Sequence, residues 1–543
     1  MARPRERPGP ANPDPRRRVM QGGSRRPRPS YRPAGVDEPL AWRWTALESA
    51  VLFAFCTWVF FWSLAALPGP IEGDTLFHYR MAQLILERGP WVSIDGLPYT
   101  VLGAHGTDQN WLFHLVTAPL TLLGETAKDI HLATAIVAAA MVAALVVILR
   151  RNRVPYAPLV CLLMVTASQL VPYRFLVLRG QDFAVPIMVA MLFAILARRS
   201  LWCGIGAFLF MQGYHAAVIL GLFCAVAAAL QWREDGRPHW RTLLAVFYGV
   251  MLGLLLSPWF PDNVRYLIFH TVFKVAKAED VSFGLLGSEW SLPPWDQVLV
   301  ESWPANLLFF AALAVGAFLA WRGRMKFSRE AIAFCAVTLV FLGMYKYSGW
   351  RFAEYYIPFA VLSAALVWRD AAVASPGRVA TRDVPALAAA ALAAWTLYQG
   401  VFYLTGLRTI AVPVSAYQRQ MQYVLAHDRA PMVFNSRWWD YVVLFFQAPD
   451  AKYVAGLDGH FLKFGDPARF NLWYAILRGQ MLDDPALASK IHDGFAARWA
   501  VISVADRRLA LALLHSPDAR LRVQGFEGWL FEVKAAGAAW PES

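Results

Sequence analysis

Ionisable side chains gather directly after the first long apolar run, in the stretch IEGDTLFHYR (residues 71–80). Asp74 and His78 are four positions apart, so a helix would place both side chains on one face. Glu72 and Arg80 flank this pair. Carboxylates in such a position can act as a general base or hold a divalent metal ion. A solvated loop with extended charged side chains gives the same pattern, so this stretch alone leaves both interpretations open.

Two further acidic stretches follow along the chain. In YRFLVLRGQDFAVP (173–186), Asp182 stands just before an apolar run, where a helix dipole alone would favour a carboxylate. In LLGSEWSLPPW (285–295), Glu289 precedes a tryptophan and two prolines, which indicates an ordered loop. Taken singly, either acid can be a helix-end or solvated residue.

A fourth stretch, NSRWWDYVVLFF (435–446), places Trp438 and Trp439 before Asp440 at the end of a predicted strand. Paired indole rings beside a carboxylate suit a polar ligand that has an apolar face. Ordinary packing of the two rings is the alternative interpretation.

Two more candidates lie within apolar sequence. His215, in MQGYHAAV, falls at a predicted turn between apolar runs, where an ionisable group is a functional hypothesis or a hydrogen-bonded structural histidine. Arg351 and Glu354, in KYSGWRFAEYYIP, are three positions apart at the end of a span. They can pair with each other, or Arg351 can face a phosphate, which fits the planar guanidinium group.

The composition indicates a membrane protein that crosses the bilayer many times. Of 543 residues, 57% are hydrophobic and 16% charged, and the mean hydropathy is +0.39. The run 111–123 is too short to span comfortably and is predicted to lie at the interface. About eleven spans are predicted, at 46–67, 129–149, 155–171, 184–198, 201–213, 215–231, 241–260, 304–322, 330–346, 352–368 and 384–404.

The net charge of +13 at first suggests a nucleic-acid partner, but its distribution argues against one. The basic residues lie in the Arg/Pro-rich tail 1–43, predicted to be disordered, and in short loops between apolar runs. This is the pattern of the positive-inside rule. It predicts a plasma (inner) membrane protein with a cytoplasmic N-terminus. The loops 68–128 and 261–303 and everything after residue 404 are then extracytoplasmic.

Residues 405–543 read as a polar domain outside the membrane. Four short apolar segments are predicted to be buried strands, and helical patterns at 484–496 and 505–515 lie between them. The strand segments are APMVFNS (430–436), AKYVAGL (451–457), RWAVISV (498–504) and GWLFEV (528–533). The fold class is therefore an α-helical polytopic membrane protein, with the transmembrane domain at 44–404, followed by an extracytoplasmic α/β domain.

Taken in order, the four acidic stretches resemble the catalytic subunits of oligosaccharyltransferases, which belong to the GT-C class of membrane glycosyltransferases. EGDTLFHYR is similar to the acid, aromatic and arginine of that family's first external loop, and RGQDF to its second, with one acid in place of two. SEWSLPPW is similar to the Ser-Glu pair of its long loop. WWDYV is similar to its Trp-Trp-Asp-Tyr-Gly signature, with Val442 at the glycine position. IDGLPYTVLG (94–103) and GYH (213–215) look like parts of uncharacterised bacterial GT-C-like proteins.

The resemblance implies a polyprenyl-phosphate or polyprenyl-diphosphate sugar donor among the membrane lipids. The acceptor, at the extracytoplasmic face, would be a glycan, a lipid or a protein. It assigns catalysis to Asp74, Asp182 and Glu289, and a divalent cation (Mg²⁺ or Mn²⁺) to the same three carboxylates. The implied donor-binding residues are Arg351, His215, His78 and Arg80. The implied acceptor-binding residues are Trp438, Trp439 and Asp440.

Three alternatives stay open from the sequence. The protein can carry out oligosaccharyltransferase-type protein glycosylation, or it can bind a lipid-linked glycan without catalysis. A transporter is the third. Transporters carry charges in the middle of their spans or broken helices in repeated halves. Here the acids cluster on one predicted external face and the sequence shows no internal repeat, which disfavours transport.

Overall fold

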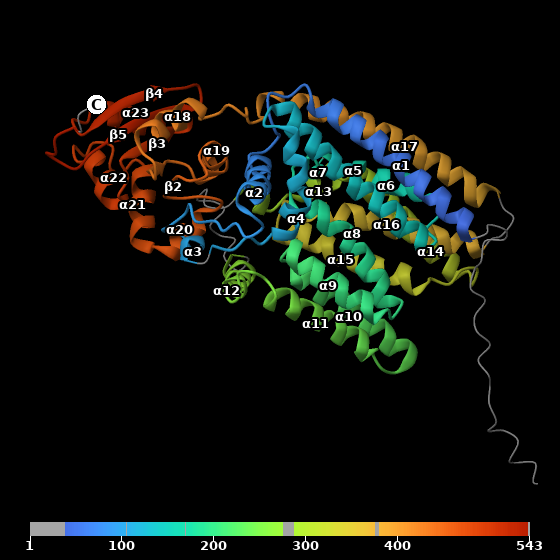
Figure 1. Ribbon diagram of the computed structural model, residues 1–543. Helices are drawn as coiled ribbons and strands as arrows, with labels where there is room; N and C mark the ends of the chain where they lie inside the picture. Colours follow the sequence, from blue (N-terminus) through green and yellow to red (C-terminus); the bar gives the residue numbers. More distant parts are fainter. Residues whose placement is uncertain (1–37, 105, 169, 275–286, 375–378, 541–543) are drawn as a thin grey trace, which may run out of the picture. The chain divides into compact units, whose positions relative to one another are not determined.

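Apolar helices make up most of the computed structural model, which describes residues 38–104, 106–168, 170–274, 287–374 and 379–540 (Figure 1). From Thr45 to Ser543 the chain forms one compact unit. Most of the tail predicted to be disordered lies outside the described residues. The first helix, α1 (Glu38–Leu64), includes the last residues of the predicted tail, 38–43.

Seven helices of the described residues are long and apolar enough to cross a membrane, which makes the chain a multi-pass membrane protein. They comprise α1 and the helices α5 (Ala127–Arg151), α10 (Ala217–Asp235), α14 (Trp303–Trp321), α15 (Arg329–Ser348), α16 (Ala353–Ala374) and α17 (Val379–Gly406). The other four predicted spans are shorter apolar helices, α6 (Ala157–Thr166), α8 (Gly180–Leu196), α9 (Ser200–Gly213) and α11 (Trp240–Leu255). The count of eleven crossings therefore stays a prediction. The predicted interfacial run forms α4 (Trp111–Thr117) and η2 (Ala118–Leu123).

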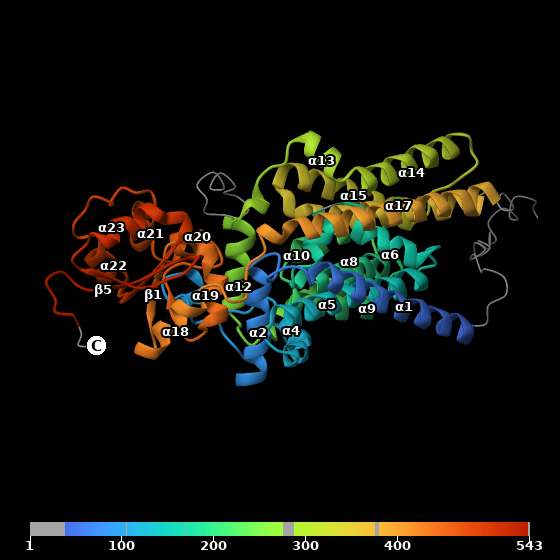
Figure 2. The same ribbon diagram turned by 90° about the horizontal axis from the view of Figure 1, so that it is seen from above.

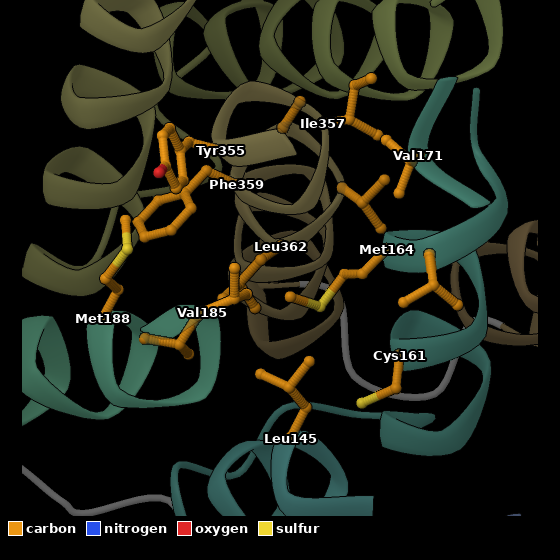
Figure 3. Packing of buried hydrophobic residues seen from close by; sticks show 14 of the residues in the cluster. Leu145, Cys161, Met164, Val171, Val185, Met188, Tyr355, Ile357, Phe359 and Leu362 are labelled. Atoms are coloured by element: carbon orange, nitrogen blue, oxygen red, sulfur yellow. The ribbon is translucent and has the colours of Figure 1, made fainter. Parts of the chain in front are cut away.

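Small and branched apolar side chains hold this bundle together. Leu145 of α5, Met164 of α6, Val185 of α8 and Leu362 of α16 meet in one buried cluster (Figure 3). Helices α9 and α11 approach each other so closely that their backbones nearly touch at Gly249. A Cβ atom added to Gly249 would lie 2.3 Å from a backbone oxygen of α9, so only glycine fits this contact. Close approach through small residues is a common way for helices to associate in membranes.

Short helices connect the spans on the side where the acidic stretches lie. They are α2 (Asp74–Arg88), α3 (Val101–Ala104), α7 (Leu170–Phe175), α12 (Asp262–Ile268), the π-helix η3 (Phe269–Lys274), α13 (Trp295–Glu301) and the 3₁₀ turns η5 (Ser288–Trp290) and η6 (Trp350–Phe352). Of the two interpretations left open for the first acidic stretch, the helix is the one found: Asp74 and His78 both lie on α2.

The last part of the chain forms a mixed five-stranded sheet in the order β2-β1-β3-β5-β4. All four predicted strand segments are found, as β1 (Met432–Asn435), β2 (Lys452–Tyr453), β3 (Trp499–Ser503) and β5 (Gly528–Val533). Strand β1 pairs in parallel with β2 and β3, whereas β5 runs antiparallel to β3 and β4. The edge strand β4 (Ala519–Gln524) was not predicted, because its arginines and exposed positions mask the alternation of a buried strand.

Helices and 3₁₀ turns surround the sheet. They are η7 (Leu407–Thr409), α18 (Gln418–His427), η8 (Trp438–Asp440), α19 (Tyr441–Gln447), α20 (Gly459–Gly465), α21 (Pro467–Leu477), α22 (Leu487–Phe495), η9 (Val504–Asp506) and α23 (Arg507–Leu514). The predicted helices at 484–496 and 505–515 correspond to α22 and α23.

Both faces of the sheet are buried, because neighbouring residues of each central strand enter different hydrophobic clusters. Val433 faces the cluster that contains α18 and α19, and Phe434 faces the cluster that contains α21, α22 and α23. Helix α2 joins the first cluster through Phe77, which packs against Tyr441 and Phe445 of α19. Figures 1 and 2 show α2 and α19 side by side. The helix that begins with Asp74 is therefore held by the α/β domain.

Candidate active site

The first acidic stretch is positioned where α2 begins. Asp74 is the first residue of α2, where the helix dipole favours a negative charge, and Glu72 lies in the turn before it. Between them, Gly73 lets α19 approach, since a Cβ atom there would lie 2.6 Å from Cγ2 of Val442. Val442 is the residue at the position where the resembled signature has glycine, and it fills the space above Gly73.

Arg179 binds both of these carboxylates. Its guanidinium group donates to Glu72 and, at 2.5 Å, to Oδ2 of Asp74, and only 4% of the residue is exposed. Burial opposes the charge of Arg179, but Asp74 and Glu72 hold its pKa above the ordinary value. Burial also raises the pKa of Glu72, and Arg179 acts in the opposite direction. The Asp74 side chain keeps 41% of its area exposed, so a ligand can reach it.

A second buried ion pair adjoins the first. Arg174 of α7 donates to Oε2 of Glu354 on α16 at 3.0 Å, and its guanidinium group lies 3.8 Å from Oε2 of Glu72. The hydroxyl of Tyr173 donates to Glu72 at 3.2 Å. Glu354 thus pairs with Arg174, and the alternative in which it forms a salt bridge with Arg351 is wrong.

Asp182 stands in the first turn of α8, three residues after Arg179 along the chain. It is 3% exposed, and neither carboxylate oxygen has a hydrogen-bond partner in the part of the chain that the structure describes. The charges of Glu354 and Arg179 act on it. Asp182 therefore borders the ion-pair cluster without being part of its hydrogen bonds.

Glu289 and Arg351 lie on the facing turns η5 and η6. The guanidinium carbon of Arg351 lies 4.5 Å from the centre of the Trp290 ring. Gly349 has φ +124°, and a Cβ atom there would lie 2.8 Å from the Glu289 carbonyl oxygen, so this turn requires glycine. Glu289 acts electrostatically on Arg179 and Arg351. Asp74 and Glu289 therefore act directly on Arg179, Asp182 borders it, and Arg351 is connected to this group through Glu289.

The other three residues predicted to bind the donor have hydrogen-bond partners outside the cluster around Arg179. Arg80 lies on α2 but donates to Gln83 at 2.6 Å and to Glu87 at 3.1 Å, away from the cluster around Arg179. His215 lies 3.2 Å from Nδ1 of His270 through its Nε2 atom. His78 lies one turn after Asp74 and enters a separate buried contact with His114.

The predicted acceptor residues lie in the α/β domain. The rings of Trp438 and Trp439 meet edge to face at 5.4 Å, and Arg437 covers Trp439 at 4.9 Å. Asp440 accepts a hydrogen bond from the Tyr417 hydroxyl at 2.8 Å, and burial raises the pKa of Asp440 to about 6. These three residues are not part of the cluster around Arg179, although the next helix, α19, packs directly on α2.

The three predicted metal ligands do not form a cation site as they are placed. Among the described residues, no group of three or more His, Cys, Asp or Glu side chains is arranged to hold a metal ion. Arg179 occupies the position between Glu72 and Asp74 that a cation would need. The divalent cation stays a prediction, and in this arrangement arginine balances the carboxylate charge.

Comparison with solved structures places this geometry in a known fold. ArnT from Cupriavidus metallidurans matches in the apo state, with a TM-score of 0.54, 16% identity, and coverage of 92% of this chain and 100% of ArnT. The same protein bound to undecaprenyl phosphate matches at a TM-score of 0.54 and 14% identity, over 92% and 99%. The Archaeoglobus fulgidus oligosaccharyltransferase in the apo form matches at a TM-score of 0.51 and 11% identity, over 87% and 71%. The chain has a GT-C-like fold.

The sequence-level comparisons find no match: no protein-family model and no curated protein matches the chain. At 11–16% identity the matched structures show the GT-C-like fold alone, so the roles of single residues rest on the geometry.

Sequence reasoning missed the partners that arrange this site. The pairing of Arg174 with Glu354 joins residues 180 positions apart, and no local pattern predicts it. Asp108 and His114 were also missed. The available indication was a histidine inside the interfacial run 111–123 with a carboxylate just before it.

Proposed function

We propose that this GT-C-like chain is a membrane glycosyltransferase. It transfers a sugar or glycan from a polyprenyl-phosphate- or polyprenyl-diphosphate-linked donor to an acceptor on the extracytoplasmic face. The observation that carries the proposal is the cluster in which buried Arg179 binds Glu72 and the accessible carboxylate of Asp74. The undecaprenyl phosphate bound to the matched ArnT structure supports a donor of this class.

The proposed reaction needs two kinds of charge, and the cluster supplies both. When the sugar–phosphate bond breaks, negative charge develops on the phosphate and positive charge on the sugar. Arg351 is the proposed partner of the phosphate, because a guanidinium group binds phosphate oxygens with two parallel hydrogen bonds. The accessible carboxylate of Asp74 stabilises the sugar and orients the acceptor, with Asp182 and Glu289 completing the site.

The proposed acceptor contacts are Trp438, Trp439 and Asp440. The Trp439 side chain is 40% exposed and meets the Trp438 ring edge to face, so part of its ring is available to the apolar face of a sugar or peptide. Because α19 follows directly and packs on α2, an acceptor held here is anchored to the helix that carries Asp74.

The lipid tail has an apolar cavity available to it. A cavity of about 610 Å³ lies between α6, α14, α16 and α17. Its lining is almost entirely apolar, as hydrocarbon requires, and includes Leu159, Leu307, Val361, Ala364 and Leu392. We assign this cavity to a hydrocarbon chain of a bound lipid.

Two carboxylate variants test the catalytic assignment. In Asp74→Asn and Glu289→Gln, we expect consumption of a polyprenyl-linked sugar by purified protein in lipid vesicles to fall roughly 100-fold or more, as for loss of a catalytic carboxylate. The matched control is Asp493→Asn, whose carboxylate is 62% exposed and distant from these residues in the α/β domain; it should turn over at the parental rate. Unchanged consumption in both site variants would overturn the proposal.

The same assay separates catalysis from binding alone. A protein that only binds the lipid-linked glycan retains the radiolabelled donor and releases no product with any acceptor. Protein glycosylation is tested with a peptide that carries an Asn-X-Ser/Thr acceptor, beside glycan and lipid acceptors under the same conditions.

A further inference from the structure

A chain of three buried ionisable side chains runs from the loop before α4 to α2. Nδ1 of His114 lies 2.6 Å from Oδ2 of Asp108, and Nε2 of His114 lies 2.7 Å from Nδ1 of His78. Asp108, His114 and His78 are 6%, 0% and 8% exposed. The backbone N–H of Asn110 donates to Oδ1 of Asp108 at 2.9 Å, so both carboxylate oxygens are held in place. Hydrophobic packing alone would not require these three side chains to be connected by hydrogen bonds.

The hydrogen bonds fix which nitrogen of each ring carries the proton. An ionised carboxylate only accepts hydrogen bonds, so Nδ1 of His114 is the donor to Asp108. In the neutral ring the opposite nitrogen, Nε2, is then an acceptor, and Nδ1 of His78 must donate to it. The last atom of the chain, Nε2 of His78, is therefore left with a free lone pair. No hydrogen bond to it is found among the described residues, and it is not one of the fully buried polar atoms.

The His78 side chain lies on the side of α2 that carries the acidic cluster. His78 follows Asp74 by four residues, so both side chains project from one face of the helix. The groups that act electrostatically on His78 are His114 from α4 and Arg179 from the loop before α8. Phe77 and Phe113 pack edge-on against the His78 ring and hold its orientation. Burial, His114 and Arg179 all lower the pKa of His78, which keeps the ring neutral near pH 7.

We propose that His78 is the general base of the transfer reaction, and that His114 and Asp108 are its positioning residues. The inference rests on the proposed glycosyltransferase function. As the acceptor oxygen or nitrogen forms its bond to the sugar and the sugar–phosphate bond breaks, the acceptor proton passes to Nε2 of His78. The Nδ1 proton of His78 then moves to Nε2 of His114. The positive charge comes to rest on His114, beside the carboxylate of Asp108.

The carboxylates and the histidines have different roles in this proposal, which explains why the site contains both. Oδ2 of Asp74 already accepts a hydrogen bond from Arg179, so Asp74 supplies charge and orientation. A weak base is sufficient at His78, because the acceptor group becomes acidic only as its new bond forms. A positive charge on His78 would be repelled by Arg179. The relay avoids this repulsion, because it moves the charge from His78 to His114.

The pH profile of transfer tests the relay. His78→Gln should lower the maximal rate roughly 100-fold or more and remove the part of the acidic limb that comes from the histidine, because only the carboxylates then need to be deprotonated. Asp108→Asn should lower the rate about 10-fold and move the acidic limb to lower pH, since imidazolium loses its negative partner. The matched control is His515→Gln, which removes a histidine bonded only to a backbone carbonyl at the surface of the α/β domain and should leave the profile unchanged.

The outcomes separate this inference from the proposed function. If Asp74→Asn abolishes transfer while His78→Gln and Asp108→Asn keep the parental rate and profile, the relay is overturned and the glycosyltransferase assignment stands. If none of the variants alters turnover of the lipid-linked sugar, both fail.

A second measurement does not depend on activity. Solid-state ¹⁵N spectra of the histidine rings in the parental protein at pH 7 should show His78 protonated at Nδ1 and bare at Nε2. The Nε2–H tautomer at His78 would overturn the relay even if every variant proved inactive.

Discussion

Arg179 lies buried between the carboxylates of Glu72 and Asp74, and its positive charge offsets part of the cost of placing these acids here. Removing one partner of a buried ion pair costs more than the pair contributes, because the other charge stays behind in a poor solvent. The spacing of Asp74 and His78 predicted their common helix face. It could not predict Arg179 or the Arg174–Glu354 pair, because these contacts depend on how distant segments meet.

Replacing the arginine should destabilise the protein strongly. We expect Arg179→Gln to lower the free energy of unfolding by about 3–5 kcal/mol at pH 7, since two carboxylates lose their counter-charge. Thermal unfolding in detergent measures the change. Adding Glu72→Gln to Arg179→Gln should recover part of the loss by removing one uncompensated charge.

The control for this series is an exposed ion pair. Arg265 has a 61% exposed side chain and pairs with Asp262 one turn away, so Arg265→Gln should change stability by less than about 1 kcal/mol. Equal losses for the two arginine variants would contradict the view that burial sets the cost.

Helix α2 acts as the element that joins two parts of the chain. Its first turn carries Asp74, its second carries His78, and Phe77 between them enters the core of the α/β domain. Periodicity in the sequence predicted the apolar helices and four of the five strands. Periodicity did not predict that Val442 of α19 would pack on Gly73. A contact between helices that are remote in the sequence produces no periodic pattern in either of them.

A methyl group at Gly73 tests the contact between these two elements. Gly73→Ala places a Cβ atom 2.6 Å from Cγ2 of Val442, so one helix must shift. We expect a loss of about 1–3 kcal/mol in stability, together with lower activity, as α2 moves relative to Arg179. The double variant with Val442→Ala should recover both quantities, as measured by unfolding and sugar transfer.

Glycine replacement by itself is controlled at Gly221 of α10, where an added Cβ atom meets nothing within 4 Å. Gly221→Ala should be neutral or stabilising, because alanine favours the helix. If Gly73→Ala behaves in the same way, the close packing of α19 on α2 has no energetic consequence.

For the whole molecule, the sequence predicted the class of architecture better than its details. Apolar runs and basic loops led to a GT-C-like membrane protein with an α/β domain, and the fold comparison agrees. Four of the predicted spans are helices of 10–17 residues, so length alone does not settle how many of them cross. The orientation still rests on the distribution of arginine and lysine.

Two exposed positions report that orientation. In a variant that lacks the five native cysteines, Asp483→Cys in the α/β domain should react with a membrane-impermeant maleimide in intact spheroplasts. Arg237→Cys, in the basic loop between α10 and α11, should react only after the membrane is opened. The reverse labelling pattern would contradict an extracytoplasmic α/β domain.

The core shared by α2 and α19 has a consequence for how the protein is made. Helix α2 is synthesised early and α19 near the end, with most of the transmembrane domain translated between them. During that interval Phe77 lacks its contacts with Tyr441 and Phe445, which are of the long-range kind that form late. Gly73 and Phe77 therefore reach their final packing only after α19 has been made, so the position of α2 is settled late in folding.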